Sequence, residues 1–278
     1  MKIGICAPST PLSRDDAARV DALARAKYPG AQLVWHEQCF GEAGHFAGDD
    51  AARLAAFTGL ANDPGIDAIW FARGGYGAAR IAQDAVRGLG NAARGKIYLG
   101  YSDGGNLLGA LYQAGIGFPV HGPMVRDIRR TGGEAAVRRA LDWMTRREPS
   151  ALEPGLIAGQ KYAAFNLMTL AMMVGTPIMP DLSGHVLIIE EVSEYLYAFD
   201  RAMFNVMTYL ADKGIAGLRL GRVGDIPEND RPFGEDEAAI AQRWCARSGI
   251  AYLGRADIGH DGDNKIVPFA LATASARQ

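Results

Sequence analysis

The chain has 278 residues, of which 49% are hydrophobic and 22% are charged, and its formal net charge is −2. This composition is that of an ordinary globular protein with one large or two modest domains. The near-neutral charge argues against nucleic acid or an anionic membrane surface as a partner. The three cysteines, Cys6, Cys39 and Cys245, are scattered without metal-ligand spacing, as expected of reduced thiols in the cytoplasm.

The apolar runs of the chain are short. The first run reaches Pro8 after a few residues and lacks the apolar segment of a signal peptide. No stretch approaches the roughly 18 uninterrupted apolar residues that a membrane-spanning helix needs. We therefore predict a cytoplasmic protein with no membrane partner.

The first half of the chain alternates short apolar runs with segments of helical period. Ser13 followed by Asp16 caps a helix reaching about Lys27. Strands separated by helices of this length predict an α/β fold of parallel β-α-β units. The predicted strands are Lys2–Cys6, Gln32–His36, Asp67–Ala72, Lys96–Leu99 and Phe118–Val120, and the further helices are Asp49–Asn62, Asn106–Ala114 and Gly133–Arg147.

Residues 148–155 interrupt this alternation with two prolines and a glycine, which is typical of a linker. We therefore predict an N-terminal domain at residues 1–147, a linker at 148–155 and a C-terminal domain at 156–278. The predicted elements of the second domain are helices at Phe165–Val174, Tyr197–Lys213 and Glu235–Ser248, strands at His185–Glu190 and Gly217–Val223, and short strands near Tyr252 and Lys265.

The sequence Gly100-Tyr-Ser-Asp-Gly104 lies between a predicted strand and a predicted helix. A G-x-S-x-G in this position is the nucleophile-elbow pattern, in which a sharp turn exposes the serine hydroxyl. The helix that follows also directs free backbone N–H groups at a developing oxyanion. The pattern makes Ser102 a candidate nucleophile, while an ordinary strand–helix turn is the alternative.

A serine nucleophile needs a histidine base oriented by a carboxylate. His260 lies in a glycine-rich polar loop that can aim an imidazole, whereas the other histidines are assigned structural or solvated positions, with His121 as a turn former and His185 without an evident partner. Glu190 continues an apolar strand and is predicted to point inward, where its alternative role is a salt bridge to Arg201. The neighbouring Glu191 and Glu194 are predicted to face solvent or to cap the following helix.

The segment Arg73-Gly-Gly-Tyr-Gly77 follows the third predicted strand. Ligands bind at the carboxyl ends of strands in such sheets, and consecutive backbone amides can hold an anion. Arg73, Gly74 and Tyr76 are therefore predicted to bind substrate, although a plain turn explains the glycines equally well. No metal-ligand motif and no dinucleotide fingerprint is present, so we expect neither metal nor cofactor.

Together these stretches resemble the LD-carboxypeptidase family of serine peptidases, which includes muramoyltetrapeptide carboxypeptidases and microcin C immunity peptidases. The resemblance follows the chain in order over nearly its whole length. The combination of Arg-Gly-Gly-Tyr-Gly with Gly-Tyr-Ser-Asp at this distance is specific. The matching stretches are Ala7–Ser9, Arg73–Gly77, Gly100–Asp103, His121–Pro123, Asn166–Leu167, Gly175–Pro177, Leu187–Glu191, Asp200–Arg201, Gly259–His260 and Pro268.

The resemblance implies that Ser102 is the nucleophile, His260 the general base and Glu190 the acid that orients it. It implies an oxyanion hole made by the backbone N–H groups of Asp103 and Gly75. The implied fold is a flavodoxin-like nucleophile domain followed by a smaller C-terminal α/β domain. The family members are typically homodimers that need no metal.

Two departures from the family pattern fall near the predicted site. Gly105 stands where the family usually has threonine, and Ala164-Phe165 replaces the two glycines that precede Asn166-Leu167. Neither departure removes a member of the predicted triad. We expect both to reshape the substrate side of the pocket.

The resemblance implies a serine carboxypeptidase that releases the terminal D-alanine from murein tetrapeptides. A microcin C-type immunity peptidase is the alternative within the family, but the compact chain leaves little room for a loop that would hold adenine. An α/β-hydrolase-type esterase also has the order Ser–acid–His, although its acid and histidine are not expected to lie so far apart. A non-catalytic peptide-binding homologue is disfavoured because no triad residue is missing.

Overall fold

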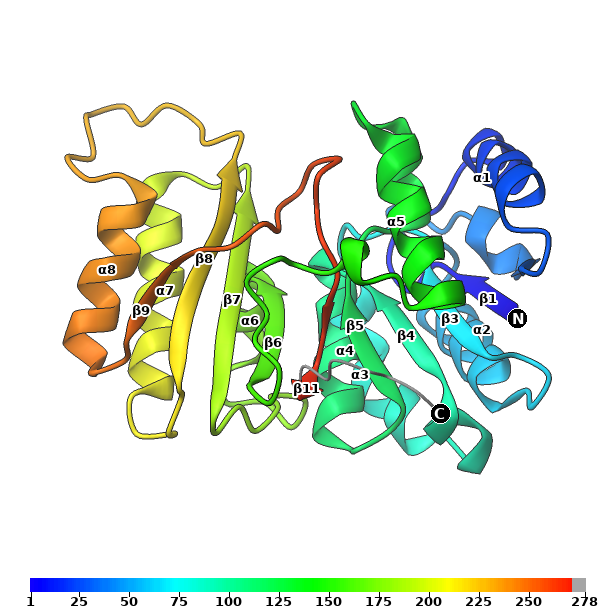
Figure 1. The fold of residues 1–278 in the computed structure, drawn as a ribbon, viewed down its shortest axis with the longest axis horizontal. Coiled ribbons are helices and arrows are strands. Elements are labelled where there is room, and N and C mark those ends of the chain that lie inside the picture. Colours follow the sequence, from blue (N-terminus) through cyan, green and yellow to red (C-terminus); the bar gives the residue numbers. More distant parts are fainter. Residues whose placement is uncertain (272–278) are drawn as a thin grey trace.

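The computed structural model describes residues 1–271, which form two β-sheets flanked by helices (Figure 1). The strands of the first sheet are β1 (Lys2–Cys6), β2 (Gln32–Trp35), β3 (Ala68–Phe71), β4 (Ile97–Gly100), β5 (Phe118–His121) and β10 (Val267–Pro268). Their order is β10-β5-β4-β3-β1-β2, and all run parallel except β10. Without β10 this is the flavodoxin-like order, so the predicted fold class is confirmed.

Helices cover both faces of this sheet because its central strands are apolar on both sides. Ala68 and Trp70 of β3 share one core with α1 and α5, whereas Ile69 and Phe71 share another with α2, α3 and α4. Ser13 is the N-cap of α1 as predicted, and its hydroxyl accepts a hydrogen bond from the N–H of Asp16 at 3.1 Å. The helices are α1 (Arg14–Lys27), α2 (Asp50–Asn62), α3 (Ala78–Arg87), α4 (Gly105–Gln113) and α5 (Gly133–Arg146), with short 3-10 turns η1 (Glu37–Phe40), η2 (Asn91–Gly95), η3 (Ser102–Gly104), η4 (Val125–Arg129) and η5 (Pro149–Ala151).

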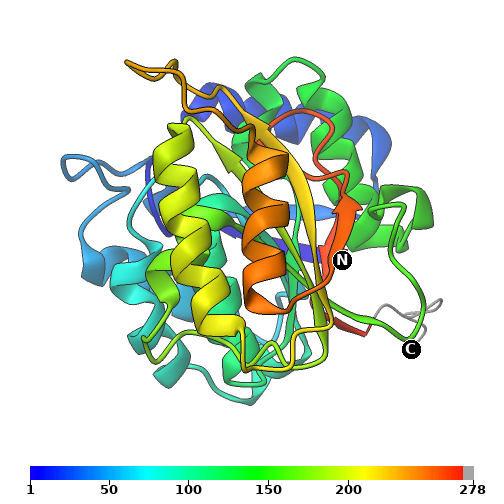
Figure 2. The same ribbon diagram turned by 90° about the vertical axis from the view of Figure 1, so that its left-hand side faces the viewer.

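The second sheet contains β6 (Lys161–Asn166), β7 (His185–Val192), β8 (Gly217–Gly224), β9 (Tyr252–Arg255) and β11 (Ala270–Leu271), in the order β11-β6-β7-β8-β9. Its helices are α6 (Leu167–Met173), α7 (Leu196–Leu210) and α8 (Glu237–Ser248). Figure 2 shows α7 and α8 side by side over one face of this sheet. Strand β6 was not among the predicted elements.

The C-terminal segment crosses between the two sheets. Strand β10 pairs with β5 in the first sheet, and β11 pairs with β6 in the second. The predicted linker contains η5 and the buried Glu153, which forms an ion pair of 2.6 Å with Arg219 of β8. The division at residues 1–147, 148–155 and 156–278 stays a prediction, and residues 272–278 of its last part lie outside the described residues.

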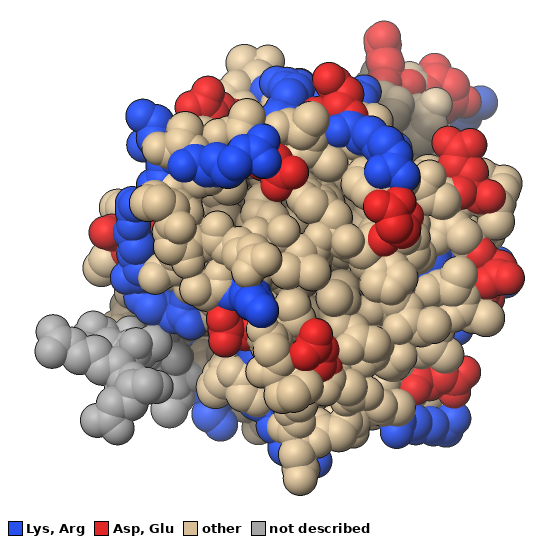
Figure 3. All heavy atoms as spheres, turned by 90° about the vertical axis from the view of Figure 1, so that its right-hand side faces the viewer, with Lys and Arg blue, Asp and Glu red and all other residues tan. Residues whose placement is uncertain are grey.

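The face of the molecule drawn in Figure 3 carries charged side chains of both signs. On the end of the molecule that carries α1 and α2, Figure 3 shows acidic and basic side chains interspersed, in keeping with the formal net charge of −2. Among residues 1–271, no helix is both long enough and apolar enough to cross a membrane.

Candidate active site

A tight turn after β4 presents Ser102. Strand β4 runs through Tyr101 into η3, which leads directly into α4, as the elbow pattern predicts. Ser102 has a φ of +55°, a left-handed conformation that costs a non-glycine residue roughly 1–3 kcal/mol. A Cβ atom at Gly100 or Gly104 would lie 2.4 Å or 2.8 Å from the Cδ2 atom of Phe71. Both glycines of the motif are therefore needed for the ring of Phe71 to pack under the turn.

The side chain of Asp103 ties this turn to two other loops. Its carboxylate is buried and accepts hydrogen bonds from Ser9 Oγ at 2.5 Å, the backbone N–H of Ala78 at 2.8 Å and Asn106 Nδ2 at 3.0 Å. Ala78 is the first residue of α3, whose N-cap Gly77 has no side chain to offer. Asp103 therefore caps α3, although it lies outside that helix in the sequence, and it fixes the turn in its strained conformation.

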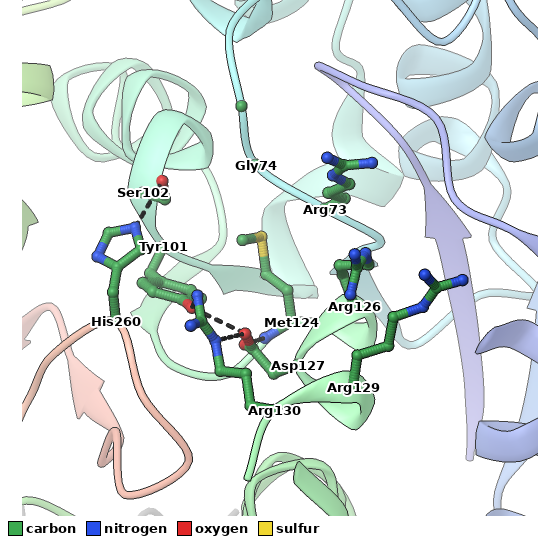
Figure 4. Close-up of a pocket in the computed structure, with 11 residues that line it drawn as sticks. Arg73, Gly74, Tyr101, Ser102, Met124, Arg126, Asp127, Arg129, Arg130 and His260 are labelled. Carbon is green, nitrogen blue, oxygen red and sulfur yellow. Dashed lines mark hydrogen bonds and ion pairs between the residues drawn. The ribbon is translucent and has the colours of Figure 1, made fainter. Parts of the chain in front are cut away.

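Ser102, His260 and Glu190 form a hydrogen-bonded chain. Ser102 Oγ lies 2.9 Å from His260 Nε2, and His260 Nδ1 lies 2.5 Å from Glu190 Oε2 (Figure 4 shows the first of these contacts). An ionised carboxylate can only accept hydrogen bonds, so His260 Nδ1 carries the proton. His260 Nε2 is then free to accept the proton of the Ser102 hydroxyl.

Burial and charge act in opposite directions on His260. Burial alone lowers the pKa of this histidine, but the charge of Glu190 and the hydrogen bond to it have the larger combined effect. The pKa of His260 is therefore raised above the ordinary value of 6.5. The partner that orients the imidazole also favours its protonated form.

The loop that carries His260 is held from both sides. Arg222 of β8 forms an ion pair with Asp261, with Nη2 2.8 Å from Oδ1. Arg139 of α5 donates to the carbonyl oxygen of Gly262 at 3.0 Å. Because one arginine comes from the second sheet and the other from a helix of the first, the loop is fixed between the two sheets, next to Ser102.

Glu190 points into the interior, as predicted from its place in an apolar strand. It is fully buried on β7, and its partner is His260. Gly221 of the adjacent β8 makes room for it, since a Cβ atom there would lie 3.0 Å from Glu190 Cβ. Arg201, the alternative partner, instead lies over the ring of Tyr197.

The prediction that Glu191 faces solvent or caps the following helix was wrong. Glu191 is 3% exposed, and its carboxylate accepts hydrogen bonds from Asn166 Nδ2 at 2.6 Å and from the N–H of Met168 at 2.8 Å. It thus stabilises the start of α6, the preceding helix. Burial raises the pKa of Glu191 to about 7. Glu194 is partly exposed in the loop after β7.

Two further histidines differ from their predictions. His121 is not a turn residue but ends β5, fully buried, with Nε2 3.1 Å from Asn264 Oδ1. Burial lowers its pKa to about 4. His185 does have a partner, since its Nε2 lies 2.6 Å from the hydroxyl of Tyr112. The remaining two are structural or solvated, His36 as the N-cap of η1 and His45 against the ring of Phe46.

Ser102 and His260 line a cavity of about 440 Å³. This volume lies toward the lower end of the range of small-molecule sites, roughly 300–1,000 Å³. Figure 4 shows Ser102 and His260 on one side of it and three arginines on the other. The contribution of η4 to this cavity was not predicted, although the three arginines within residues 125–130 are a visible signal in the sequence. The cavity is lined by Arg73, Gly74, Gly75, Tyr101, Ser102, Met124, Arg126, Asp127, Arg129, Arg130 and His260.

The predicted substrate-binding residues are only partly brought together. Arg73 and Gly74 line the cavity, and so does Gly75 of the predicted oxyanion hole. Tyr76 does not line it; this residue is 53% exposed, and its ring lies near the ring of Phe46. The roles of all these residues stay predictions.

The two departures from the family pattern meet each other in the structure. A Cβ atom at Gly105 would lie 3.4 Å from Phe165 Cδ1 and 3.3 Å from Thr169 Cγ2. Gly105, Ala164 and Phe165 are all buried, and none of them lines the cavity. The large Phe165 packs on the small Gly105 behind the serine turn, and the expectation that the two departures reshape the substrate side of the pocket stays a prediction.

Within residues 1–271, no group of three or more His, Cys, Asp or Glu side chains is placed to hold a metal ion. Cys6, Cys39 and Cys245 are buried free thiols. Burial raises the pKa of Cys39 and Cys245 to about 12, so neither is a nucleophile at neutral pH.

Two family models match the chain. The LD-carboxypeptidase N-terminal domain matches residues 3–122, and the LD-carboxypeptidase C-terminal domain matches residues 162–274. The chain therefore belongs to the LD-carboxypeptidase family, which confirms the resemblance noted in the sequence.

Named relatives agree with this family. The chain is 26% identical to the murein tetrapeptide carboxypeptidase of Pseudomonas aeruginosa, covering 81% of this chain and 77% of the relative. It is 30% identical to a putative carboxypeptidase of Streptomyces coelicolor, covering 82% and 74%. These relatives place the chain among the carboxypeptidases, which are hydrolases.

Solved structures share the fold. A muramoyltetrapeptide carboxypeptidase from Oxalobacter formigenes superimposes with a TM-score of 0.78 at 23% identity, covering 98% of this chain and 96% of the other. The microcin C7 self-immunity protein MccF gives a TM-score of 0.74 at 18% identity, covering 99% and 97%. At these identities the likeness concerns the fold alone.

Proposed function

We propose that this protein is a serine carboxypeptidase that hydrolyses the L,D-peptide bond before the terminal D-alanine of murein tetrapeptides, a reaction of cell-wall recycling. The observation that carries the proposal is the hydrogen-bonded chain of Ser102, His260 and Glu190 beside a cavity rich in arginine. The name of the Pseudomonas aeruginosa relative supports the choice of substrate.

In the proposed reaction, His260 Nε2 takes the proton of Ser102 as Oγ attacks the carbonyl carbon of the scissile bond. The protonated imidazole is stabilised by Glu190 and then gives the proton to the amine of the leaving D-alanine. Water, deprotonated by the same histidine, hydrolyses the resulting ester and restores the serine hydroxyl.

The N–H groups of Gly75 and Asp103 are proposed to stabilise the oxyanion. Thr10 Oγ1 donates to the carbonyl oxygen of Gly74 at 2.6 Å. In a trans peptide the carbonyl and the following N–H point in opposite directions, so this bond turns the N–H of Gly75 away from Thr10. Gly75 has a φ of +107°, and a Cβ atom there would lie 2.6 Å from Thr10 Cγ2, so only glycine fits.

The lining of the cavity favours a peptide over a nucleotide as substrate. An adenine ring is usually held by stacking on an aromatic side chain. Within residues 1–271, Tyr101 is the one aromatic residue besides His260 that lines this cavity, and the centroids of the two rings are 4.8 Å apart. The hydroxyl of Tyr101 is bonded to Asp127 at 2.9 Å. Tyr101 is thus already engaged by the protein.

A first prediction tests the proposed exopeptidase activity. A tetrapeptide with a free C-terminal carboxylate should be cleaved far faster than the same peptide amidated at that end. The expected difference in kcat/KM corresponds to about 2–4 kcal/mol, because the amide leaves a charge-assisted bond unmade. Release of the terminal residue is followed by mass spectrometry. Equal rates on the two peptides would indicate an esterase or an endopeptidase instead.

A second prediction concerns pH. His260 must be neutral to accept the serine proton, and its pKa is raised above 6.5 by Glu190. As the pH falls through this raised value, kcat/KM should fall, so half-maximal activity on the acid side should lie above pH 6.5. Titration of His121 does not account for this limb, because its pKa is about 4. An acid limb near pH 4 would contradict the assignment of His260 as base.

A further inference from the structure

The cavity beside Ser102 is lined by four arginines, Arg73, Arg126, Arg129 and Arg130. Arg126 and Arg129 lie in η4, shortly after β5, and Arg130 directly follows η4. Arg73 comes from another part of the sheet, just after β3. Asp127 is the one carboxylate among the lining residues in the described part of the chain, residues 1–271. The cavity is therefore suited to an anionic group.

Three of these arginines are already engaged by the protein. Arg129 Nε lies 2.5 Å from Asp16 Oδ1, and Arg130 Nε lies 2.7 Å from Asp127 Oδ1. Arg73 Nη1 donates to the carbonyl oxygen of Pro11 at 3.0 Å, which braces the loop after β1. Figure 4 shows Arg130 directed at Asp127, away from the other arginines.

Arg126 differs from the other three arginines in the contacts of its guanidinium. Among residues 1–271 its guanidinium makes no hydrogen bond, and its nearest carboxylate is Asp16 at 3.9 Å. Asp16 is itself held by Arg129 and by the hydroxyl of Ser13 at 2.7 Å. The side chain of Arg126 is 32% exposed and lines the cavity opposite Ser102.

The surroundings of Arg126 disfavour its positive charge. Burial, followed by the positive charges of Arg129, Arg73 and Arg130, lowers its pKa, and only part of this effect is offset by Asp16. A planar guanidinium with all its donors free is suited to a carboxylate, which it can bind through two parallel hydrogen bonds. An incoming carboxylate would supply both the missing bonds and the missing negative charge.

We propose that Arg126, rather than Arg73, binds the free terminal carboxylate of the residue that is released. This inference rests on the proposed carboxypeptidase function and assigns its specificity for a C-terminal residue to one side chain. Arg129 and Arg130 shape the wall, each neutralised by its own aspartate. Arg73 holds the loop that carries the proposed oxyanion donor Gly75.

The test compares two substrates on three enzymes. The substrates are a murein tetrapeptide with a free C-terminus and its C-terminal amide, and the enzymes are the wild type, Arg126→Met and Arg73→Met. Methionine removes the charge and keeps an unbranched apolar side chain similar to the aliphatic part of arginine. For Arg126→Met, kcat/KM on the free acid should fall by about 30- to 1,000-fold, whereas kcat/KM on the amide should stay within about threefold of the wild type.

Unchanged turnover of the amide by Arg126→Met also shows that the triad of this variant is folded. Arg73→Met should retain the preference for the free acid, whatever it loses in overall rate. If Arg126→Met does not fold, Arg126→Lys provides the measurement, because a single ammonium should keep only part of the preference. The inference is overturned if Arg126→Met, or Arg126→Lys in its place, keeps the full preference, or if Arg73→Met loses it.

Failure of the proposed function looks different from failure of this inference. In that case none of the three enzymes, the wild type included, releases a terminal residue from either peptide.

Discussion

Replacing Ser102 with alanine should lower kcat on a murein tetrapeptide by about 10⁴- to 10⁶-fold, the usual cost of losing a triad nucleophile. The hydroxyl is the atom that attacks, and within the described residues no second hydroxyl is hydrogen-bonded to His260. Alanine tolerates the φ of +55° about as well as serine does, so the turn should keep its shape. The release of D-alanine by purified protein measures the effect.

The control measurement for Ser102→Ala is its affinity for the tetrapeptide. The variant should retain the affinity of the wild type for the tetrapeptide within a few-fold, measured by calorimetry, and should unfold at a similar temperature. Turnover within tenfold of the wild type would refute the assignment of Ser102 as nucleophile.

Replacing Glu190 with glutamine should lower kcat by roughly 10⁴-fold, as in other triads whose acid becomes an amide. The amide neither stabilises the imidazolium nor enforces the tautomer with the proton on Nδ1. The same change removes the charge that raises the pKa of His260 and leaves the opposing effect of burial. The acid limb of the residual activity should therefore move to lower pH, below the wild-type limb.

Two neighbouring carboxylates serve as controls for Glu190→Gln. Glu194→Gln removes a charge of the same sign four residues away and should leave both kcat and the pH limb unchanged. Glu191→Gln should mainly lower the unfolding temperature, because this carboxylate accepts bonds from Asn166 and from the start of α6. A greater loss of kcat at Glu191 than at Glu190 would mean that the acid of the triad is misassigned.

The main elements of the first domain were predictable because each has a local signal. Ser13 followed by Asp16 begins α1, and the apolar runs that lead to Arg73 and to Gly100 are β3 and β4. Strand β6 was missed for a physical reason. Its sequence, Lys161-Tyr-Ala-Ala-Phe-Asn166, contains two alanines of high helix propensity and runs straight into α6 through the N-cap Asn166. Pairing with β7 on one side and with β11 on the other makes this segment a strand.

The site was predictable where its residues stand in marked local patterns and not where their roles depend on tertiary partners. Ser102, His260 and Glu190 were selected from a turn, a loop and a strand, and the structure brings them together. The free guanidinium of Arg126 could not be foreseen, because it depends on which aspartates the neighbouring arginines occupy.

Periodicity also failed to predict the packing of individual side chains. Alternation along β7 placed Glu191 on the face opposite Glu190, but it could not show that the start of α6 covers that face. The packing of the large Phe165 against the small Gly105 could not be predicted from the sequence either. The two residues are far apart along the chain and meet only behind the serine turn.

The central claim is that Ser102 acts on the bond before a terminal D-alanine. The most direct test is mass spectrometry of a purified murein tetrapeptide after incubation with the wild-type protein and, in parallel, with Ser102→Ala. The account predicts that the wild type yields the tripeptide and free D-alanine and that the variant leaves the tetrapeptide intact. A tetrapeptide that stays intact with the wild type, is cut at an internal bond, or is trimmed equally by both proteins would contradict it.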